Sequence, residues 1–346
     1  MWQGVPSRLS KRTVRALNRF MKGLVAGALI SSAVATPASA EDLPAPTSLR
    51  FVTLNVFHGG PLSGWTGRNN HLETRLDLVV EALRDLSPDV VALQEASWSR
   101  DRGEVAARLA ERLGFNYVYT PSSMRLFETA WFNRAAAWLM DFAEGPALLS
   151  RFPIVSSEAY KLPQCGWRLD PRVLLLADLA TPGGVLRVFS THISGHHCQA
   201  EALGELVSEH RGDIPSVLMG DFNAVESSPA IRGLLARSGV IDAFRTAHPD
   251  GPGFTVYQPV MATERRASRR IDYVFLVPGR TFPGGVVDSR VVIDSPVRLG
   301  RGRTLWPSDH YGVLADLIVF PPSTGTAGRV DVRLARAPEP QYSKAP

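Results

Sequence analysis

The stretch SVLMGDFNAVESSP, residues 216–229, predicts a buried strand, a polar turn and the start of a helix. Its apolar run ends at Gly220, and Asp221 and Asn223 follow with only Phe222 between them. Because side chains alternate along a strand, Asp221 and Asn223 project from one face if the strand continues through them. The stretch ends in Ser-Pro, which fits an N-cap and a first helical residue. This pattern predicts an α/β fold with polar groups at a strand end.

The segments on either side alternate between helix-like and strand-like patterns. Apolar residues at helical spacing predict helices at residues 72–86, 105–113 and 200–210, and Gly114 is placed to cap the second. A TPGG turn predicts a hairpin between two of the strands. We expect one α/β domain over residues 48–320. The predicted strands lie at residues 49–56, 89–95, 116–120, 147–150, 173–180, 185–193, 216–221, 269–277 and 311–320.

The first 40 residues predict an export signal. Six basic residues and no acidic one precede or flank the apolar run GLVAGALISSAVA at residues 23–35, and an A-x-A pattern ends at Ala40. The apolar run is shorter than the roughly 20 residues of a membrane-spanning helix. We therefore expect cleavage after Ala40 and a secreted or periplasmic protein, with an uncleaved anchor as the alternative. Residues 41–47 form a Pro-rich junction, and residues 321–346 are expected to be a disordered tail.

Charge and motif content argue against several classes of function. The net charge of the chain is +5, but the part after the leader holds 32 Lys and Arg against 33 Asp and Glu. The domain thus lacks the overall positive field that favours non-specific nucleic-acid binding, although residues 264–270 form a local basic loop. Neither a G-x-S-x-G motif nor a P-loop occurs, which disfavours a serine hydrolase and a P-loop nucleotide hydrolase.

Both cysteines, Cys165 and Cys198, follow the leader. Export allows them to form a disulfide, and two free thiols are the alternative. The adjacent histidines of the HHC sequence at residues 196–198 match no zinc pattern, so we interpret them as part of a loop.

Polar residues collect at the ends of the predicted strands. Each one alone has an ordinary interpretation, because Asp-x-Asn is a common turn or cap and a single histidine is often structural. Together they supply hard oxygen ligands for Mg²⁺ or Mn²⁺, a group to activate water and donors for developing negative charge. Phosphoester hydrolysis needs all three. The residues are Asn55, Glu95, His192, Asp221, Asn223, Asp272, Asp309 and His310.

Seven motifs occur in one order between Phe51 and Leu317: TLNV, ALQE, LLSRFP, STHI, GDFNA, RRIDYVF and SDHYGV. In this order they resemble the endonuclease/exonuclease/phosphatase superfamily, which includes deoxyribonuclease I, apurinic endonucleases, sphingomyelinases and inositol-polyphosphate 5-phosphatases. The resemblance implies a four-layer α/β/β/α sandwich in which two mixed β-sheets pack face to face. It also places the functional site at one end of the sheets.

The resemblance implies which residues bind the metal and the substrate. Glu95 would hold Mg²⁺ or Mn²⁺, with Asn55 beside it, and Asp309 would be a second metal ligand or would orient its neighbours. Asn55 and Arg172 would contact the substrate, since family members often place a phosphate-binding arginine ahead of this strand.

The resemblance also implies the catalytic groups. Asp221 would orient and deprotonate the attacking water, and Asn223 would fix the water or the phosphate. Asp272 would pair with His310 and favour its charged form. His192 would donate to the phosphate or assist the leaving group.

Two further features have alternative interpretations. The sequence AWFNRAAAWLMDFAEG at residues 130–145 is aromatic on more than one face. It predicts either a helix buried against the outer layer or an insertion that contacts lipid at a membrane surface. His58 is interpreted as part of the rim of the site or of a loop.

These features predict an exported, metal-dependent phosphoester hydrolase, most simply a phosphodiesterase. Its substrate would be a lipid headgroup, a small molecule or a nucleic acid, so a secreted nuclease and a sphingomyelinase-like phospholipase are alternatives. A non-catalytic binding protein on the same fold is a further alternative, but the presence of Glu95, Asp221 and His310 argues against it. We expect no obligate protein partner.

Overall fold

The computed structural model describes residues 48–58, 71–100, 102–122, 132, 141–165 and 171–321. The chain divides into two compact units, Met1–Ser39 and Ala40–Pro346, and every described residue belongs to the second. No helix in this described part is long and apolar enough to cross a membrane. The leader, the Pro-rich junction and the tail after residue 321 lie outside it, so those predictions stay predictions.

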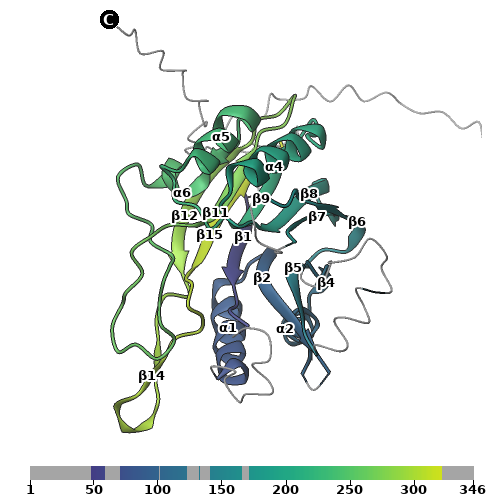
Figure 1. The fold of residues 1–346 in the computed structure, drawn as a ribbon. Helices are drawn as coiled ribbons and strands as arrows, with labels where there is room; N and C mark the ends of the chain where they lie inside the picture. Colours follow the sequence, from purple (N-terminus) through teal and green to yellow (C-terminus); the bar gives the residue numbers. More distant parts are fainter. Residues whose placement is uncertain are drawn as a thin grey trace, which may run out of the picture. The chain divides into compact units, whose positions relative to one another are not determined.

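Two β-sheets form the centre of the fold (Figure 1). The strands of the first sheet are β1 (Ser48–Asn55), β2 (Val90–Ser99), β3 (Gly103–Glu104), β4 (Asn116–Tyr119), β5 (Ala143–Ser150), β12 (Gly285–Val292) and β15 (Gly312–Ile318). Those of the second are β6 (Ile154–Lys161), β7 (Val173–Thr181), β8 (Gly184–His192), β9 (Ser216–Asp221), β10 (Ile241–Asp242) and β11 (Asp272–Val277). A separate pair joins β13 (Val297–Arg298) to β14 (Thr304–Leu305).

Both sheets are mixed. The strand order is β12-β15-β1-β2-β5-β4 in the first, with β3 beside β2, and β10-β11-β9-β8-β7-β6 in the second. In each sheet one central pair is parallel, β1 with β2 and β8 with β9, and the other pairs are antiparallel. The parallel pairs place two strand ends at the same edge in each sheet, which is where the polar residues lie.

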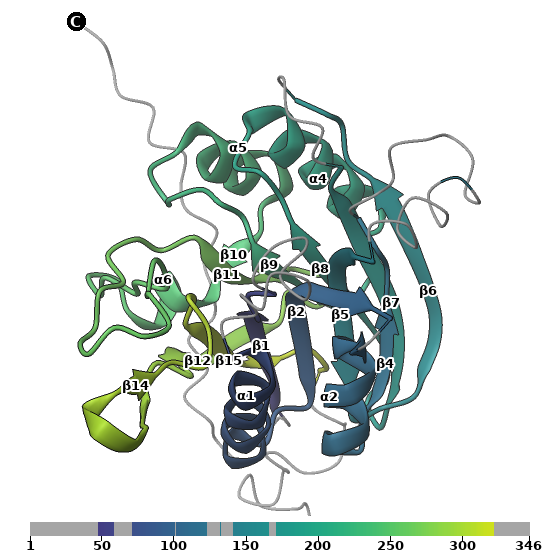
Figure 2. The ribbon, with the colours of Figure 1, turned by 60° about the horizontal axis from the view of Figure 1, so that its bottom comes forward.

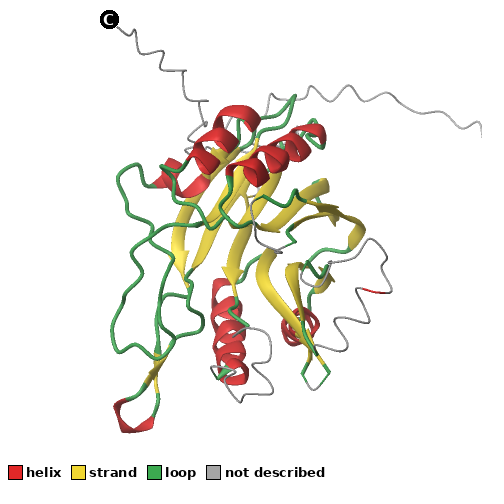
Figure 3. Ribbon diagram, viewed as in Figure 1, coloured by secondary structure: helices red, strands yellow, loops and turns green. Residues whose placement is uncertain are grey.

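Helices cover the outer face of each sheet (Figures 2 and 3). The long ones are α1 (Leu72–Leu86), α2 (Val105–Leu113), α4 (His197–Glu209) and α5 (Pro229–Ser238), and α6 (Ala243–Ala247) is short. Apolar faces of α1 and α2 pack on the first sheet, and those of α4 and α5 pack on the second.

The apolar core between the sheets follows the alternation of their strands. In β9, Val217 and Met219 face the other sheet, whereas Leu218 faces the helices. The inner faces of β1 and β15 supply residues such as Phe51 and Ala315 to the same core. The predicted four-layer α/β/β/α sandwich with two mixed sheets is therefore confirmed.

Most predicted elements are present, and the differences have local reasons. The TPGG hairpin joins β7 and β8, with Thr181 opposite Gly184. Ser228 caps α5 by accepting from the Ile231 N–H at 3.2 Å. The strands β6 and β12 and the helix α6 were not predicted. The sequence IVSSEAYK of β6 is mostly exposed at a sheet edge, so it lacks the apolar pattern of a buried strand.

Candidate active site

Polar residues from both sheets meet at one end of the sandwich. Asn55 donates from Nδ2 to Glu95 Oε1 and to Asp221 Oδ2, both at 3.1 Å. Asp221 Oδ2 also lies 3.4 Å from His192 Nε2 and 3.8 Å from His310 Nε2. The structure thus brings together the predicted residues Asn55, Glu95, His192, Asp221, Asn223, Asp272, Asp309 and His310. Their chemical roles stay predictions.

The register of the second sheet aligns three of these side chains. Asp221 at the end of β9 lies opposite His192 of β8 on one side and Asp272 of β11 on the other. Two glycines allow this close approach. A Cβ at Gly220 would collide with the carbonyl oxygen of Thr191, and one at Gly195 would collide with that of Asn223.

The GDFN sequence folds differently from a continued strand. β9 ends at Asp221, and Asn223 adopts a left-handed conformation with φ 49° while its N–H donates to Asp221 Oδ1 at 2.8 Å. This is the turn that Asp and Asn favour. Phe222 does point away, as expected, and packs edge-on against Tyr273 and Phe275 under the outer helices.

A β-bulge aims Glu95 into the site. Between Leu93 and Ala96 the register of β2 against β5 shifts, so that two residues of β2 oppose one of β5. Glu95 itself has φ 54°, which is uncommon for a residue with a side chain. A regular strand would alternate through this position, so the bulge decides where the carboxylate points.

A buried arginine organises the loops that carry the first sheet's polar residues. Arg75 of α1 is fully buried and donates to the carbonyl oxygens of Val56, Phe57 and Pro307, at 2.5 to 3.1 Å. It therefore joins the end of β1 to the segment that carries Asp309 and His310. The sequence carried a signal for it, because an arginine occupies an apolar position in the helical pattern of residues 72–86.

Asp221 and His310 have strongly perturbed pKa values. Burial, and then the charge of Asp272, raise the pKa of Asp221 to about 7. Burial opposes a charge on His310, but Asp272 and Asp221 outweigh it and hold the pKa of His310 well above its usual value. His310 Nδ1 lies 2.9 Å from Asp272 Oδ2, so the Asp–His contact inferred from the motifs is present.

His192 is neutral and accepts a hydrogen bond at Nε2. The amide of Asn223 donates to the Ile193 carbonyl oxygen at 2.9 Å, which fixes Nδ2 on this side. The same Nδ2 lies 2.9 Å from His192 Nε2, so the imidazole accepts there and carries its proton on Nδ1. Burial and the nearby charge of Arg172 lower the pKa of His192 well below its usual value, in agreement with this assignment.

The donor set fits a hard divalent cation. Burial raises the pKa of Asp309 to about 6 with a further contribution from the negative charge of Glu95, so the two carboxylates act on each other. Oxygen ligands of this kind suit Mg²⁺ or Mn²⁺. Asn55 presents its NH₂ group to Glu95 and accepts from the Phe57 N–H at Oδ1, so its oxygen would face a cation only after a half-turn of the amide that gives up these bonds. Glu95, Asp309 and Asn55 could therefore hold the metal.

Sequence reasoning missed two residues of this region. The sequence pattern places His58 at the rim of the site or in a loop, yet its Nε2 lies 3.3 Å from Glu95 Oε2 and pairs with Glu144. Glu144 at the start of β5 was not singled out at all. The ligand atoms of His58, Glu95 and Glu144 lie within 4.8 Å of one another, as do those of Asp221, Asp272 and His310.

Arg172 lies beside the site. Its Nε donates to Ser194 Oγ at 3.1 Å, and its positive charge lowers the pKa values of His192 and Glu144. It precedes β7, as the motif comparison implied. Its contact with a substrate stays a prediction.

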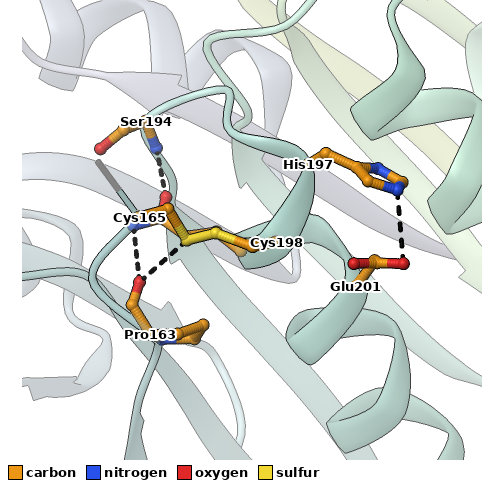
Figure 4. Close-up of a disulfide and its surroundings, with 7 residues drawn as sticks. Pro163, Cys165, Ser194, His197, Cys198 and Glu201 are labelled. Carbon is orange, nitrogen blue, oxygen red and sulfur yellow. Dashed lines mark hydrogen bonds and ion pairs between the residues drawn. A yellow bond between two sulfur atoms is a disulfide. The ribbon is translucent and has the colours of Figure 1, made fainter.

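A disulfide joins Cys165 to Cys198 close to the site (Figure 4). The Cα atoms are 6.4 Å apart, which is within the normal range for a disulfide. Gln199 donates to the Pro163 carbonyl oxygen and accepts from the Ser194 N–H, at 3.2 and 2.8 Å. The first turn of α4 is thus tied to the segment after β6 and to the loop after β8.

The aromatic stretch at residues 130–145 lies mostly outside the described residues. Of it, the structure describes Phe132, whose side chain is exposed, and residues 141–145, which lead into and begin β5. Membrane contact through this stretch stays a prediction.

The model of the Endonuclease/Exonuclease/phosphatase family matches residues 52–310. The match covers most of the chain and contains every predicted site residue. The protein belongs to this family, whose members are hydrolases that act on phosphoester bonds.

Individual relatives agree with this placement. Nocturnin from Drosophila melanogaster is 25% identical over an alignment of 197 residues, and the match covers 45% of this chain and only 29% of that protein. A mannosyl-6-phosphatase from Bacteroides thetaiotaomicron superposes with a TM-score of 0.61 at 18% identity, over 78% of this chain and 99% of that one. TDP2 from D. rerio, solved with a single-stranded DNA product, gives 0.56 at 18% identity, over 78% and 98%. At these identities the solved structures show a shared fold.

Proposed function

We propose that this protein is an exported phosphodiesterase that depends on a divalent cation, Mg²⁺ or Mn²⁺. The observation that carries the proposal is the environment of Asp221. Its buried carboxylate lies 3.1 Å from the Asn55 amide and within 3.8 Å of both His192 and His310. A carboxylate between an amide and two imidazoles can accept a proton from water while the charged imidazole of His310 contacts phosphoryl oxygens.

Three residues at strand ends of the second sheet, together with His310 from the segment ahead of β15, supply the acid–base chemistry. Asp221 takes the proton from the attacking water, and its pKa of about 7 suits a general base near neutral pH. Asn223 fixes the Asp221 carboxylate through its backbone N–H and fixes His192 through its side-chain amide. His310, kept charged by Asp272, donates from Nε2 to the phosphoryl oxygens, where negative charge develops. His192 accepts from Asn223 at Nε2, so it would donate to the leaving group through its Nδ1–H.

The residues of the first sheet hold the cation. Glu95 and Asp309 would bind it through oxygen, and Asn55 would do so after its amide turns. When bound, the cation neutralises phosphate charge and makes a water molecule more acidic. Arg172 would add a fixed positive charge for the substrate phosphate.

A nuclease is the second candidate, and the segment ahead of β11 favours it. Exposed arginines Arg266 and Arg269 and the half-exposed ring of Tyr257 lie on this segment. The N–H of Gln258 donates to the Asp309 carbonyl oxygen at 2.8 Å, so the segment is tied to the site. Arginines and aromatic rings together suit single-stranded nucleic acid.

Export is supported by two features of the chain. The leader has the layout of a signal sequence, and the described domain holds a disulfide, which persists in oxidising compartments. Cleavage after Ala40 would be read directly from the N-terminus of the protein recovered from the exported fraction.

The test is a substrate panel with the purified protein. Bis-p-nitrophenyl phosphate and p-nitrophenyl phosphate compare diester with monoester, and single-stranded DNA, plasmid DNA, sphingomyelin and an inositol phosphate test the substrate class. Each is assayed with Mg²⁺, with Mn²⁺ and with EDTA, beside Asp221→Asn as the inactive control. We expect cation-dependent diester hydrolysis that the variant loses. Hydrolysis of monoesters alone would show that the protein is a phosphatase and contradict the proposed diesterase activity. Full activity in EDTA would contradict the proposed dependence on a cation.

A further inference from the structure

His58, which is buried, and Glu144, which is partly buried, form a pair beside Glu95. His58 follows β1, Glu95 lies in the bulge of β2, and Glu144 is in β5, so three segments converge here. His58 Nε2 is 3.3 Å from Glu95 Oε2 and forms an ion pair with Glu144 Oε2. His58 is 8% exposed, so water does not replace these contacts freely.

The contacts of the pair favour a proton on one imidazole nitrogen of His58. A carboxylate only accepts hydrogen bonds, and the same imidazole nitrogen faces two carboxylates. A proton on Nε2 would therefore lie between the carboxylates of Glu95 and Glu144. The ring of Phe142 packs against the imidazole with centroids 4.9 Å apart and limits its rotation.

Glu95 is consequently held on both oxygens. Oε1 accepts from Asn55 Nδ2 at 3.1 Å, and Oε2 faces the His58 Nε2–H at 3.3 Å. Each carboxylate oxygen has a second lone pair, so both contacts leave a direction open for a cation. The bulge fixes the backbone of Glu95, and without a cation these two donors fix the plane of its carboxylate. His58 keeps its contact with Oε2 when the Asn55 amide turns its oxygen towards a cation.

We propose that His58, held by Glu144, is a positioning residue that fixes Glu95 for cation binding. The proposal rests on the proposed function, because it needs Glu95 to be a cation ligand. Removal of partners that orient a metal ligand typically weakens metal binding 10- to 100-fold. His58→Leu should therefore weaken cation binding by about this factor, and Glu144→Gln should weaken it by less because His58 remains.

One ligand atom from each of His58, Glu95 and Glu144 lies within 4.8 Å of the other two. The same spacing would allow all three residues to bind a cation directly. Stoichiometry separates the two arrangements. If His58 positions Glu95, the protein binds one cation at this side of the site. If His58 and Glu144 are ligands of their own cation, a second ion binds and both variants lose it.

The experiment measures Mn²⁺ binding to the full chain by calorimetry and electron paramagnetic resonance. The variants are His58→Leu, His58→Gln and Glu144→Gln. The matched control is His197→Gln, since His197 Nε2 also lies 3.3 Å from a glutamate oxygen, of Glu201, but on the exposed face of α4. Thermal melts check that each variant folds. The Mn²⁺ concentration for half-maximal diester hydrolysis is measured in parallel.

We expect affinity to fall 10- to 100-fold in His58→Leu, to recover largely in His58→Gln, whose amide restores a donor, and to stay unchanged in His197→Gln. Saturating Mn²⁺ should restore most of kcat in His58→Leu, which a merely structural defect would not allow. Equal affinity in the wild type and His58→Leu would overturn the positioning role, as would two ions of which each variant loses one. If His58→Leu does not fold, unchanged Mn²⁺ affinity in Glu144→Gln would also overturn the positioning role. Absence of Mn²⁺ binding by the wild type would instead overturn the proposed function.

Discussion

Asp272 and His310 belong to different sheets, yet His310 Nδ1 lies 2.9 Å from Asp272 Oδ2. Asp272 begins β11 in the second sheet, and His310 lies just ahead of β15 in the first. Asn55 and Asp221 make a second contact between the sheets at 3.1 Å. The site therefore exists only because the two sheets pack together, and the apolar core between them sets its geometry.

The contact between Asp272 and His310 predicts a large effect of Asp272→Asn. The amide removes the negative charge that outweighs the burial of His310, so the pKa of the imidazole falls and its charged form is lost near neutral pH. We expect kcat to fall about 10²- to 10⁴-fold, the range for a lost acid–base or charge-stabilising group. Kinetics on a diester and NMR titration of His310 check this. Wild-type kinetics with a lowered His310 pKa would show that its charge is not needed.

Asp221→Asn and Glu95→Gln should each reduce turnover by orders of magnitude without unfolding the protein. Both side chains serve the site, and the apolar cores lie elsewhere. Because burial disfavours the ionised form of Asp221, the neutral amide should keep or raise the melting temperature at pH 8. Circular dichroism and steady-state kinetics measure the two effects. Substantial activity in Asp221→Asn would contradict its assignment as the base.

The perturbed pKa values also predict how stability depends on pH in the metal-free protein. In the folded state Asp221 has a pKa of about 7, against about 3.9 in an unfolded chain. Between pH 6.5 and 8.5 the folded carboxyl still holds part of its proton while the unfolded one holds none, so stability falls as pH rises. The raised pKa of His310 acts in the same direction. The lowered pKa of His192 opposes them, and this effect fades as pH rises above about 6.5, where the unfolded imidazole loses its proton.

Urea unfolding in EDTA at pH 6.5, 7.5 and 8.5 measures this slope. Asp221→Asn should flatten it, because the variant removes one titrating group and lowers the pKa of His310. Equal slopes in the wild type and the variant would mean that the cluster does not control the pH dependence.

Sequence patterns located those residues of the candidate site that lie at strand ends. Asn55, His192 and Asp221 are the last residues of their strands, and Asp272 is the first of its own, so apolar runs with polar ends located them. The pairing of Asp272 with His310 was expected from the order of the seven motifs, and no local sequence pattern predicts it. Periodicity predicted α1, α2 and most central strands for the same reason, since their buried faces repeat.

Features that depend on tertiary geometry could not be predicted. The bulge that turns Glu95 into the site has no distinctive sequence, because its effect comes from the register of β2 against β5. In the sequence, Glu144 resembles any polar residue of a strand such as β5. Only the three-dimensional structure shows that it pairs with His58. Arg75 did interrupt an apolar helical face, and only the positions of three loop carbonyls explain why.

Arg75→Met should destabilise the protein and also disturb the site. The substitution keeps the apolar stem but leaves three carbonyl oxygens, those of Val56, Phe57 and Pro307, without this donor. Each lost bond to a charged group costs about 1.5–3 kcal/mol, partly offset by the burial that lowers the pKa of Arg75 to about 10. We expect a loss of several kcal/mol in urea unfolding. Arg84→Met, on the exposed face of the same helix, is the control and should be nearly neutral.

The disulfide predicts a redox-dependent stability that is separable from activity. Cys165 and Cys198 are 33 residues apart. A cross-link that closes a loop of this length reduces the conformational entropy of the unfolded chain and stabilises the folded state by about 3–4 kcal/mol. Cys198→Ser should lose about this much in urea unfolding. Dithiothreitol should lower the free energy of unfolding of the wild type to that of the variant and leave that of the variant unchanged. The kcat of both should stay within a few fold of the wild type, because β8 and β9 hold His192 and Asp221 in register without the bridge. If neither dithiothreitol nor the substitution changes the free energy of unfolding, the native chain does not form this bond.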